Sequence, residues 1–469
     1  MLGVVVVFAI GVVAGVAVNT AFGYDESVYA VAARYWVAGT PTSGWDIHRP
    51  PLPSVIGVLP ALLGGQEWQF RLVGAAFGTA TVVSTWWLGR LVAGTAVGLV
   101  AAVAVAAAAS FQRESGVFLT DIPSTLVLLI TTGLLWRQLN RPGPGVGWLW
   151  LAPLAATAFY WRYGAVIALV ALGIAAIAVG GRRLRDGWRW VGLTLLLLAV
   201  LAIPHMVFAT AVRGEPWGIV LQAGGLVADD RQLPLLEYLS WLPSTLFGPL
   251  GGVLAVVAVL VVVVRIWRPA RRTPPPSDPN GRFVEFAAIA AGSQLLVYGT
   301  LVHAEPRYLI FPMILLVLIG ASGVVALAQR VQLPAAVPLA LVGSAVMLVL
   351  GVLESVGELQ QRAASHDWTR EVGTTIGAQS AGDCSILTSD APIMSWYSGC
   401  EAYAYAATVG ESRLPVLHGK DRFMVVREDG LFQPDEAYMR TTYLPHAELI
   451  AEFRNGYGDL AAQLYRISD

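Results

Sequence analysis

Long runs of apolar residues recur along most of this chain and restrict what it can fold into. A run of about 20 mainly apolar residues can cross a bilayer as a helix, which satisfies its own backbone hydrogen bonds in hydrocarbon. With 56% hydrophobic and 13% charged residues, the chain of 469 residues has too few polar side chains to cover a soluble globule. About eleven such runs are present, near residues 2–22, 70–90, 93–110, 118–136, 148–161, 164–180, 190–210, 241–265, 284–302, 308–328 and 334–354.

The first of these runs could be mistaken for a secretory signal. It has no basic segment before it and is longer than the apolar core of a signal peptide, so we expect it to be retained as a helix. The sequence therefore predicts an all-α polytopic membrane protein of about eleven transmembrane helices, with a transmembrane domain over residues 1–355.

Arginine residues predict the orientation, because short cytoplasmic loops are enriched in Lys and Arg. We expect the N-terminus inside, and the first long loop (residues 23–69) and the C-terminal region outside, at a plasma membrane. The arginine-rich loops alternate with arginine-poor ones along the chain, and we expect the arginine-rich loops to be cytoplasmic. They contain Arg137, Arg141, Arg182, Arg183, Arg185, Arg189, Arg265, Arg268, Arg271 and Arg272.

Beyond residue 360 the charge density rises and the pattern changes to short alternating segments. We predict a small α/β extracytoplasmic domain over residues 360–469, with strands near 384–388 and 422–426 and short helices at 391–398 and 434–441. Residues 447–454 and 460–467, separated by a Gly-Tyr-Gly turn, resemble a hairpin.

The chain has two cysteines, and both lie in this C-terminal region. A disulfide between Cys384 and Cys400 fits an oxidising compartment and would stabilise the domain by roughly 3 kcal/mol. The alternative is a pair of free, buried thiols.

Acidic residues at the predicted outer ends of helices are candidates for chemistry. Asp25 and Glu26 follow the first apolar run, and Asp121 begins a later one. Ionisable groups at such places are costly and often functional. Each could instead cap a helix, because a carboxylate stabilises a helix N-terminus. Their occurrence on one membrane face favours a shared polar cavity.

Basic residues occur on the same predicted face. Arg49 lies in the first outer loop, Arg162 at the tip of a helical hairpin, and Arg307 directly before Tyr308. Arginine binds phosphate bidentately, so this face suits an anionic lipid phosphate. Arg71, at the start of the second run, could belong to the same polar site. Alternatively, its side chain could extend to the lipid headgroups as an anchor.

These residues form an ordered set of short motifs, and through them the chain resembles a known superfamily over residues 1–330. It resembles the GT-C polyprenyl-phosphate-sugar glycosyltransferases, among them the dolichyl-phosphate-mannose protein mannosyltransferases and the lipid A aminoarabinose transferases. The motifs are Asp25-Glu26-x-x-Tyr29, Arg49-Pro-Pro-Leu, Arg71-Leu72, Leu119-Thr120-Asp121-x-Pro123 and His303-x-x-x-Arg307-Tyr308.

The resemblance implies an inverting transfer of a sugar from a polyprenyl (dolichyl) phosphate to an acceptor hydroxyl on the extracytoplasmic face. It implies that Asp25 is the general base and Asp121 a second catalytic carboxylate. Arg49 replaces the lysine of the bacterial pattern. The residues implied to bind the donor phosphate are Arg49, Arg162, His303, Arg307 and Tyr308, and those implied to orient substrate are Glu26, Tyr29 and His48.

Other functions and ligands are less well supported. We expect no cofactor and no required metal, because the histidines at 48, 205 and 303 stand alone. No basic run with interleaved aromatics indicates nucleic-acid binding. A multi-span transporter or lipid-linked sugar flippase is the alternative function, although the charges gather at one face and not at the midplane. The acceptor could be a glycan, a protein or a lipid.

Overall fold

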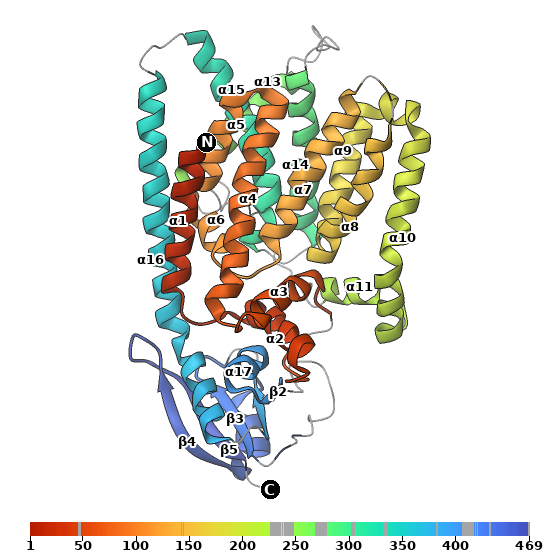
Figure 1. Cartoon of the computed structure of the whole chain (residues 1–469). Coiled ribbons are helices and arrows are strands. Elements are labelled where there is room, and N and C mark those ends of the chain that lie inside the picture. The colour runs from red at the N-terminus through yellow and green to blue at the C-terminus, as the bar shows by residue number, and fades with distance from the viewer. Residues whose placement is uncertain are drawn as a thin grey trace. The chain divides into compact units, whose positions relative to one another are not determined.

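The computed structural model groups segments that are far apart in the chain into two compact units (Figure 1). Unit 1 joins Met1–Val13 to Gly74–Ser355, and unit 2 joins Ala14–Val73 to Val356–Asp469. The structure describes all residues except 46–47, 142, 144, 226–235, 237, 239–247, 268–278, 302–304, 332–335, 381–382, 406–416, 418, 420, 431–432 and 468–469.

A helix lies on every apolar run of the sequence. Three of the helices, α1 (Leu2–Val18), α4 (Glu67–Ala93) and α16 (Ala336–Gln379), contribute residues to both units. The remaining elements of unit 1 are α5 (Thr95–Ala106), α6 (Ala109–Ser115), α7 (Asp121–Asn140), η1 (Val146–Trp150), α8 (Leu151–Trp161), α9 (Ala165–Asp186), α10 (Trp188–Arg213), α11 (Gly218–Gly225), α13 (Gly248–Trp267), α14 (Pro279–Leu301), η2 (Pro306–Leu309) and α15 (Ile310–Val331).

The prediction of a polytopic helical membrane protein is confirmed. Among the described residues, 8 helices are long and apolar enough to span a membrane, or 9 if the pair α5 and α6 counts as one bent span. That pair bends by 73° between its halves. The sequence predicted more spans because it also counted α1 and α8, which have 17 and 11 residues.

Small residues allow helices of unit 1 to pack closely. A Cβ atom added to Gly320 of α15 would lie 2.0 Å from the carbonyl oxygen of Leu254 on α13. Small side chains permit this kind of backbone approach in membrane proteins, where dispersion and not the hydrophobic effect holds helices together.

Unit 2 combines a mixed sheet with helices from both ends of its sequence. The strand order is β2-β1-β3-β5-β4, in which β1 pairs in parallel with β2 and β3 while β5 is antiparallel to β3 and β4. The elements are α2 (Tyr24–Ala38), α3 (Leu52–Leu62), β1 (Cys384–Thr388), α17 (Ala391–Ser398), β2 (Glu401–Tyr403), β3 (Asp421–Arg427), α18 (Glu436–Tyr438), η4 (Met439–Tyr443), η5 (Leu444–His446), β4 (Ala447–Arg454) and β5 (Leu460–Ile467).

The small C-terminal sheet domain and its terminal hairpin are therefore confirmed. The core of the sheet includes Ile386 and Phe423 from its strands and Val372 and Ile376 from α16. The segment 23–69, which the sequence presents as one long outer loop, contains the two helices α2 and α3. These helices belong to the same compact unit as the C-terminal sheet.

A disulfide joins the two cysteines of the chain. Cys384 begins β1 and Cys400 directly precedes β2, with their Cα atoms 5.1 Å apart. The bond closes the segment that contains α17, so it ties this helix to the two parallel strands on either side of it.

Candidate active site

The two acidic residues at the start of α2 have different surroundings. Glu26 is buried, and its Oε2 accepts a hydrogen bond of 3.0 Å from the backbone N–H of Gly23, the residue before the helix. This bond caps the N-terminus of α2. The capping role considered for both acidic residues thus belongs at least to Glu26.

Arg71 is the principal partner of Glu26. Its Nε lies 3.0 Å from Oε1 and its Nη2 lies 3.1 Å from Oε2, a bidentate contact between two buried side chains. Arg71 also donates to the carbonyl oxygens of Asn19 and Ala21. Because none of its surface is exposed, the alternative role as a headgroup anchor is wrong.

The charge of Arg71 also controls the ionisation of Glu26. Burial opposes the charged form of Glu26 and acts to raise its pKa. The nearby guanidinium and its hydrogen bonds outweigh this effect and hold the pKa of Glu26 below its ordinary value. Glu26 therefore serves as a helix cap and as the ion-pair partner of Arg71, and the substrate-orienting role that the resemblance implied for it stays a prediction.

Asp25 lies at a more accessible place. Its Oδ1 is 2.9 Å from Nη2 of Arg49, and the two side chains are 21% and 36% exposed. Tyr29 is buried one helical turn after Asp25, and His48 directly precedes Arg49 and is half-buried. Unit 2 thus brings together five of the predicted site residues: Asp25, Glu26, Tyr29, His48 and Arg49.

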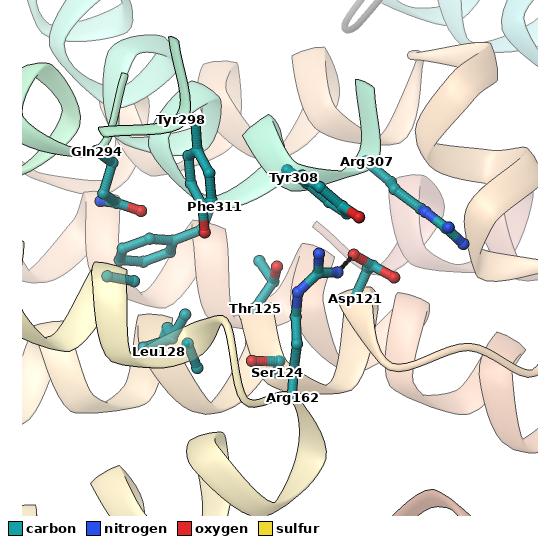
Figure 2. Close-up of a pocket in the computed structure, with 12 residues that line it drawn as sticks. Asp121, Ser124, Thr125, Leu128, Arg162, Gln294, Tyr298, Arg307, Tyr308 and Phe311 are labelled. Carbon is teal, nitrogen blue, oxygen red and sulfur yellow. Dashed lines mark ion pairs between the residues drawn. The ribbon is translucent and has the colours of Figure 1, made fainter. Parts of the chain in front are cut away.

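Unit 1 contains a pocket in which four other predicted residues meet (Figure 2). Asp121 is the first residue of α7, and Arg162 follows α8 in an extended conformation that ends the helix. Arg307 and Tyr308 come from η2. The lining residues are Asp121, Ser124, Thr125, Leu128, Arg162, Ala165, Ala168, Gln294, Tyr298, Arg307, Tyr308 and Phe311.

Arg162 is held between an acid and an aromatic ring. Its guanidinium forms an ion pair with Asp121, and its Cζ lies 4.3 Å from the ring centroid of Tyr308. The Tyr308 ring in turn lies 6.0 Å from that of Tyr298. The cation–π contact and the ion pair together fix the plane of the guanidinium.

The pocket also contains polar residues that the sequence analysis did not identify. Gln294 and Tyr298 stand four residues apart in an apolar helix, α14, and both line the pocket. This spacing places them on one helix face, which is a signal available in the sequence. Ser124 and Thr125 add hydroxyl groups from α7. His303, predicted to bind the donor phosphate, lies outside the described residues.

The pocket contains hydrogen-bond donors that an anion could use. Two guanidinium groups, Arg162 and Arg307, line it together with hydroxyl groups, and each guanidinium also has a carboxylate partner, Asp121 and Glu305 respectively. Arg307 Nε lies 3.7 Å from Oε2 of Glu305. Charge-assisted hydrogen bonds from arginine are among the strongest available to a phosphate oxygen. Within the described part of the chain, no group of three or more His, Cys, Asp or Glu residues could hold a metal ion.

Comparison with known proteins agrees with the motifs. Residues 48–208 match the model of a family described as dolichyl-phosphate-mannose-protein mannosyltransferase. No curated protein matches the chain. The family match supports the predicted glycosyltransferase class for this segment.

Solved structures share the fold over nearly the whole chain. ArnT from Cupriavidus metallidurans bound to undecaprenyl phosphate has a TM-score of 0.70 at 14% identity, covering 99% of this chain and 97% of ArnT. The apo state of that protein gives 0.66 at 14% identity, with the same coverage. The archaeal oligosaccharyltransferase AglB from Archaeoglobus fulgidus, in complex with an inhibitory peptide and a dolichol-phosphate, gives 0.59 at 10% identity, covering 98% and 74%.

The predicted resemblance is thereby confirmed. The chain shares the fold of the ArnT and AglB structures, and residues 48–208 match the model of the dolichyl-phosphate-mannose-protein mannosyltransferase family.

Proposed function

We propose that this protein transfers a sugar from a polyprenyl-phosphate donor to an acceptor hydroxyl on the extracytoplasmic face of the membrane, with inversion at the anomeric carbon. The observation that carries this proposal is the division of roles at the start of α2. Glu26 is buried and forms an ion pair with Arg71, whereas Asp25 is partly exposed beside Arg49. A carboxylate in such a position can accept a proton from a bound hydroxyl.

The reaction requires one proton acceptor and one stabilised leaving group. The acceptor oxygen forms a bond to the anomeric carbon while the bond from that carbon to the phosphate oxygen breaks. Asp25 takes the hydroxyl proton, and the polyprenyl phosphate leaves with the bonding electron pair. Arginine side chains stabilise the charge that develops on the phosphate.

The lipid donor is supported by the fold and by the pocket of unit 1. The ArnT and AglB structures contain undecaprenyl phosphate and dolichol-phosphate, respectively. In this chain, we assign phosphate binding to Arg162 and Arg307, with Asp121 orienting Arg162 through their ion pair. In unit 2, we assign the same role of phosphate binding to Arg49, which is paired with Asp25.

Replacing Asp25 by Asn tests the proposal. Purified protein in detergent is supplied with a polyprenyl-phosphate sugar and a candidate glycan, protein or lipid acceptor. The substitution keeps the shape of the side chain and removes its basicity, so transfer should fall by about 10²- to 10⁴-fold. The matched control is Asp186→Asn, which changes an exposed carboxylate at the end of α9.

The same assay separates the enzyme from the alternative transporter or flippase. Detergent abolishes any transport signal, so covalent product from the wild-type protein excludes a function limited to translocation. Near-normal transfer by a folded Asp25→Asn variant would still support an enzyme that transfers sugar, but it would show that Asp25 is not the general base. Mass spectrometry of surface glycans in a deletion strain then identifies the sugar and the acceptor.

A further inference from the structure

The segment that follows α2 is attached to the C-terminal sheet through a single carboxylate. Glu401, the first residue of β2, accepts hydrogen bonds from two consecutive backbone amides. The N–H of Thr42 donates to Oε1 at 2.7 Å and the N–H of Ser43 donates to Oε2 at 2.6 Å. Both oxygens of one side chain are thus engaged by the loop that leads to Arg49.

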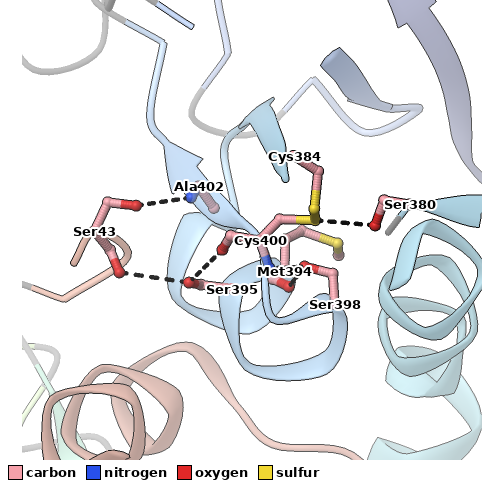
Figure 3. The surroundings of a disulfide bond; sticks show 8 residues. All are labelled: Ser43, Ser380, Cys384, Met394, Ser395, Ser398, Cys400 and Ala402. Carbon is pink, nitrogen blue, oxygen red and sulfur yellow. Dashed lines mark hydrogen bonds between the residues drawn. A yellow bond between two sulfur atoms is a disulfide. The ribbon is translucent and has the colours of Figure 1, made fainter. Parts of the chain in front are cut away.

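Ser43 strengthens this attachment from the other side (Figure 3). The N–H of Ala402 donates to Ser43 Oγ at 2.8 Å, and Ser395 Oγ lies 3.4 Å from the carbonyl oxygen of Ser43. The next residue, Gly44, has φ +80°, and a Cβ atom added there would lie 2.5 Å from Cβ of Ser395. The loop backbone therefore lies directly against α17.

The surface that receives the loop is covalently restrained. The disulfide ends at Cys400, the residue before Glu401, and β2 pairs with β1 in the register Ser385 to Glu401. Burial acts to raise the pKa of Glu401, but the hydrogen bonds from Thr42 and Ser43 lower it below its ordinary value. Glu401 is thus held in its ionised, accepting form.

The same segment also holds α2. Arg34 Nη1 donates to the carbonyl oxygen of Trp396 on α17 at 2.7 Å, and the guanidinium lies 3.6 Å from the centroid of the Trp396 ring. Asp25 is part of α2, and Arg49 follows Ser43 by six residues. The disulfide-closed segment consequently contacts both α2, which carries Asp25, and the residues Ser43 and Gly44, which precede Arg49 in the chain.

We propose that Glu401 is a positioning residue for this ion pair. By fixing the amides of Thr42 and Ser43, it limits where Arg49 can lie relative to Asp25, without itself touching substrate. The inference rests on the proposed function, in which Asp25 is the base. It gives the C-terminal domain a role in organising the site as well as in folding.

The test is Glu401→Gln, alone and combined with Arg49→Gln. A glutamine offers one acceptor oxygen and turns an NH2 group toward the second amide, so one of the two hydrogen bonds is lost. Peptide-resolved hydrogen exchange should show faster exchange over the segment that contains Thr42 and Ser43. Sugar transfer (kcat/KM) should fall by about tenfold, and the same change in the Arg49→Gln background should have little further effect, because the two residues act as a unit.

Controls keep this result specific. Glu448→Gln changes an exposed carboxylate on β4 of the same domain and should alter neither exchange nor transfer. If Glu401→Gln does not fold, Ser43→Ala removes the bond from Ala402 and should have a smaller effect in the same direction.

Two failures are distinguishable. Wild-type protein that makes no product with any donor would overturn the proposed function, and this inference with it. Two results with an active wild-type protein would overturn the inference alone. One is that Glu401→Gln leaves hydrogen exchange or sugar transfer unchanged. The other is that Glu401→Gln lowers kcat/KM by the same factor in the Arg49→Gln background as in the wild type.

Discussion

At the scale of single residues, the first turn of α2 shows how neighbours in the sequence acquire different roles. Consecutive residues on a helix point about 100° apart, so Asp25 and Glu26 cannot face the same surroundings. Glu26 points inward to Arg71, and Asp25 remains partly exposed beside Arg49. Removing one partner of a buried ion pair costs about 3–5 kcal/mol, so the Glu26–Arg71 pair is an important support for this turn.

In the unit 1 pocket, the guanidinium of Arg162 is held in a fixed plane, which suits it to bind a phosphate group. Its planar group is stacked on Tyr308 and paired with Asp121. Arg162→Lys keeps the charge but loses the planar fork and the stacking. We expect the KM for the polyprenyl-phosphate donor to rise by roughly tenfold, as for the loss of one charge-assisted hydrogen bond. Steady-state kinetics in detergent measures this.

The control for that substitution is Arg330→Lys, at an exposed arginine in the last turn of α15. It should leave the donor KM unchanged. A donor KM in Arg162→Lys equal to that of the wild type would remove Arg162 from phosphate binding and return its ion pair to a purely structural role.

At the scale of elements, the packing of α13 on α15 depends on the absence of a side chain at Gly320. Gly320→Ala would place a methyl group 2.0 Å from a backbone oxygen that cannot rotate away. The helices must separate, at a cost of about 1–3 kcal/mol. We expect a lower midpoint of thermal unfolding in detergent, measured by differential scanning fluorimetry.

Gly292 provides a matched control on α14. A Cβ atom added there meets nothing within 4 Å. Gly292→Ala should therefore leave the midpoint unchanged or raise it, because alanine favours a helix over glycine by up to about 1 kcal/mol. Equal midpoints for Gly320→Ala and the wild type would show that the α13–α15 contact tolerates a larger residue.

At the scale of the whole molecule, the orientation in the membrane is a prediction that the cysteines can test. We expect the C-terminal sheet on the extracytoplasmic side, where Cys384 and Cys400 remain oxidised. Thiol alkylation of intact cells with a membrane-impermeant reagent should label the protein only after reduction. Labelling from the cytoplasmic side without reductant would contradict the predicted orientation and the predicted side of sugar transfer.

Much of the fold could be predicted from the sequence because its determinants are local. Every apolar run lies on a helix, since hydrocarbon leaves the backbone few other ways to satisfy its hydrogen bonds. The antiparallel pair of 447–454 with 460–467 also follows from a local pattern, two alternating segments around a glycine turn. The motifs likewise identified Asp121, Arg307 and Tyr308, and the place of Arg162 at a hairpin tip identified this arginine. All four residues line one pocket.

Other features depend on contacts between distant residues, and local pattern does not encode them. Nothing near Arg71 in the sequence distinguishes a headgroup anchor from a buried partner of Glu26, 45 residues earlier. The sequence presents 23–69 as a loop, yet this segment belongs to one unit with the C-terminal sheet and contacts it through pairs such as Ser43 with Glu401. Only the tertiary structure decides these pairings, because they depend on which surfaces meet after the chain has folded.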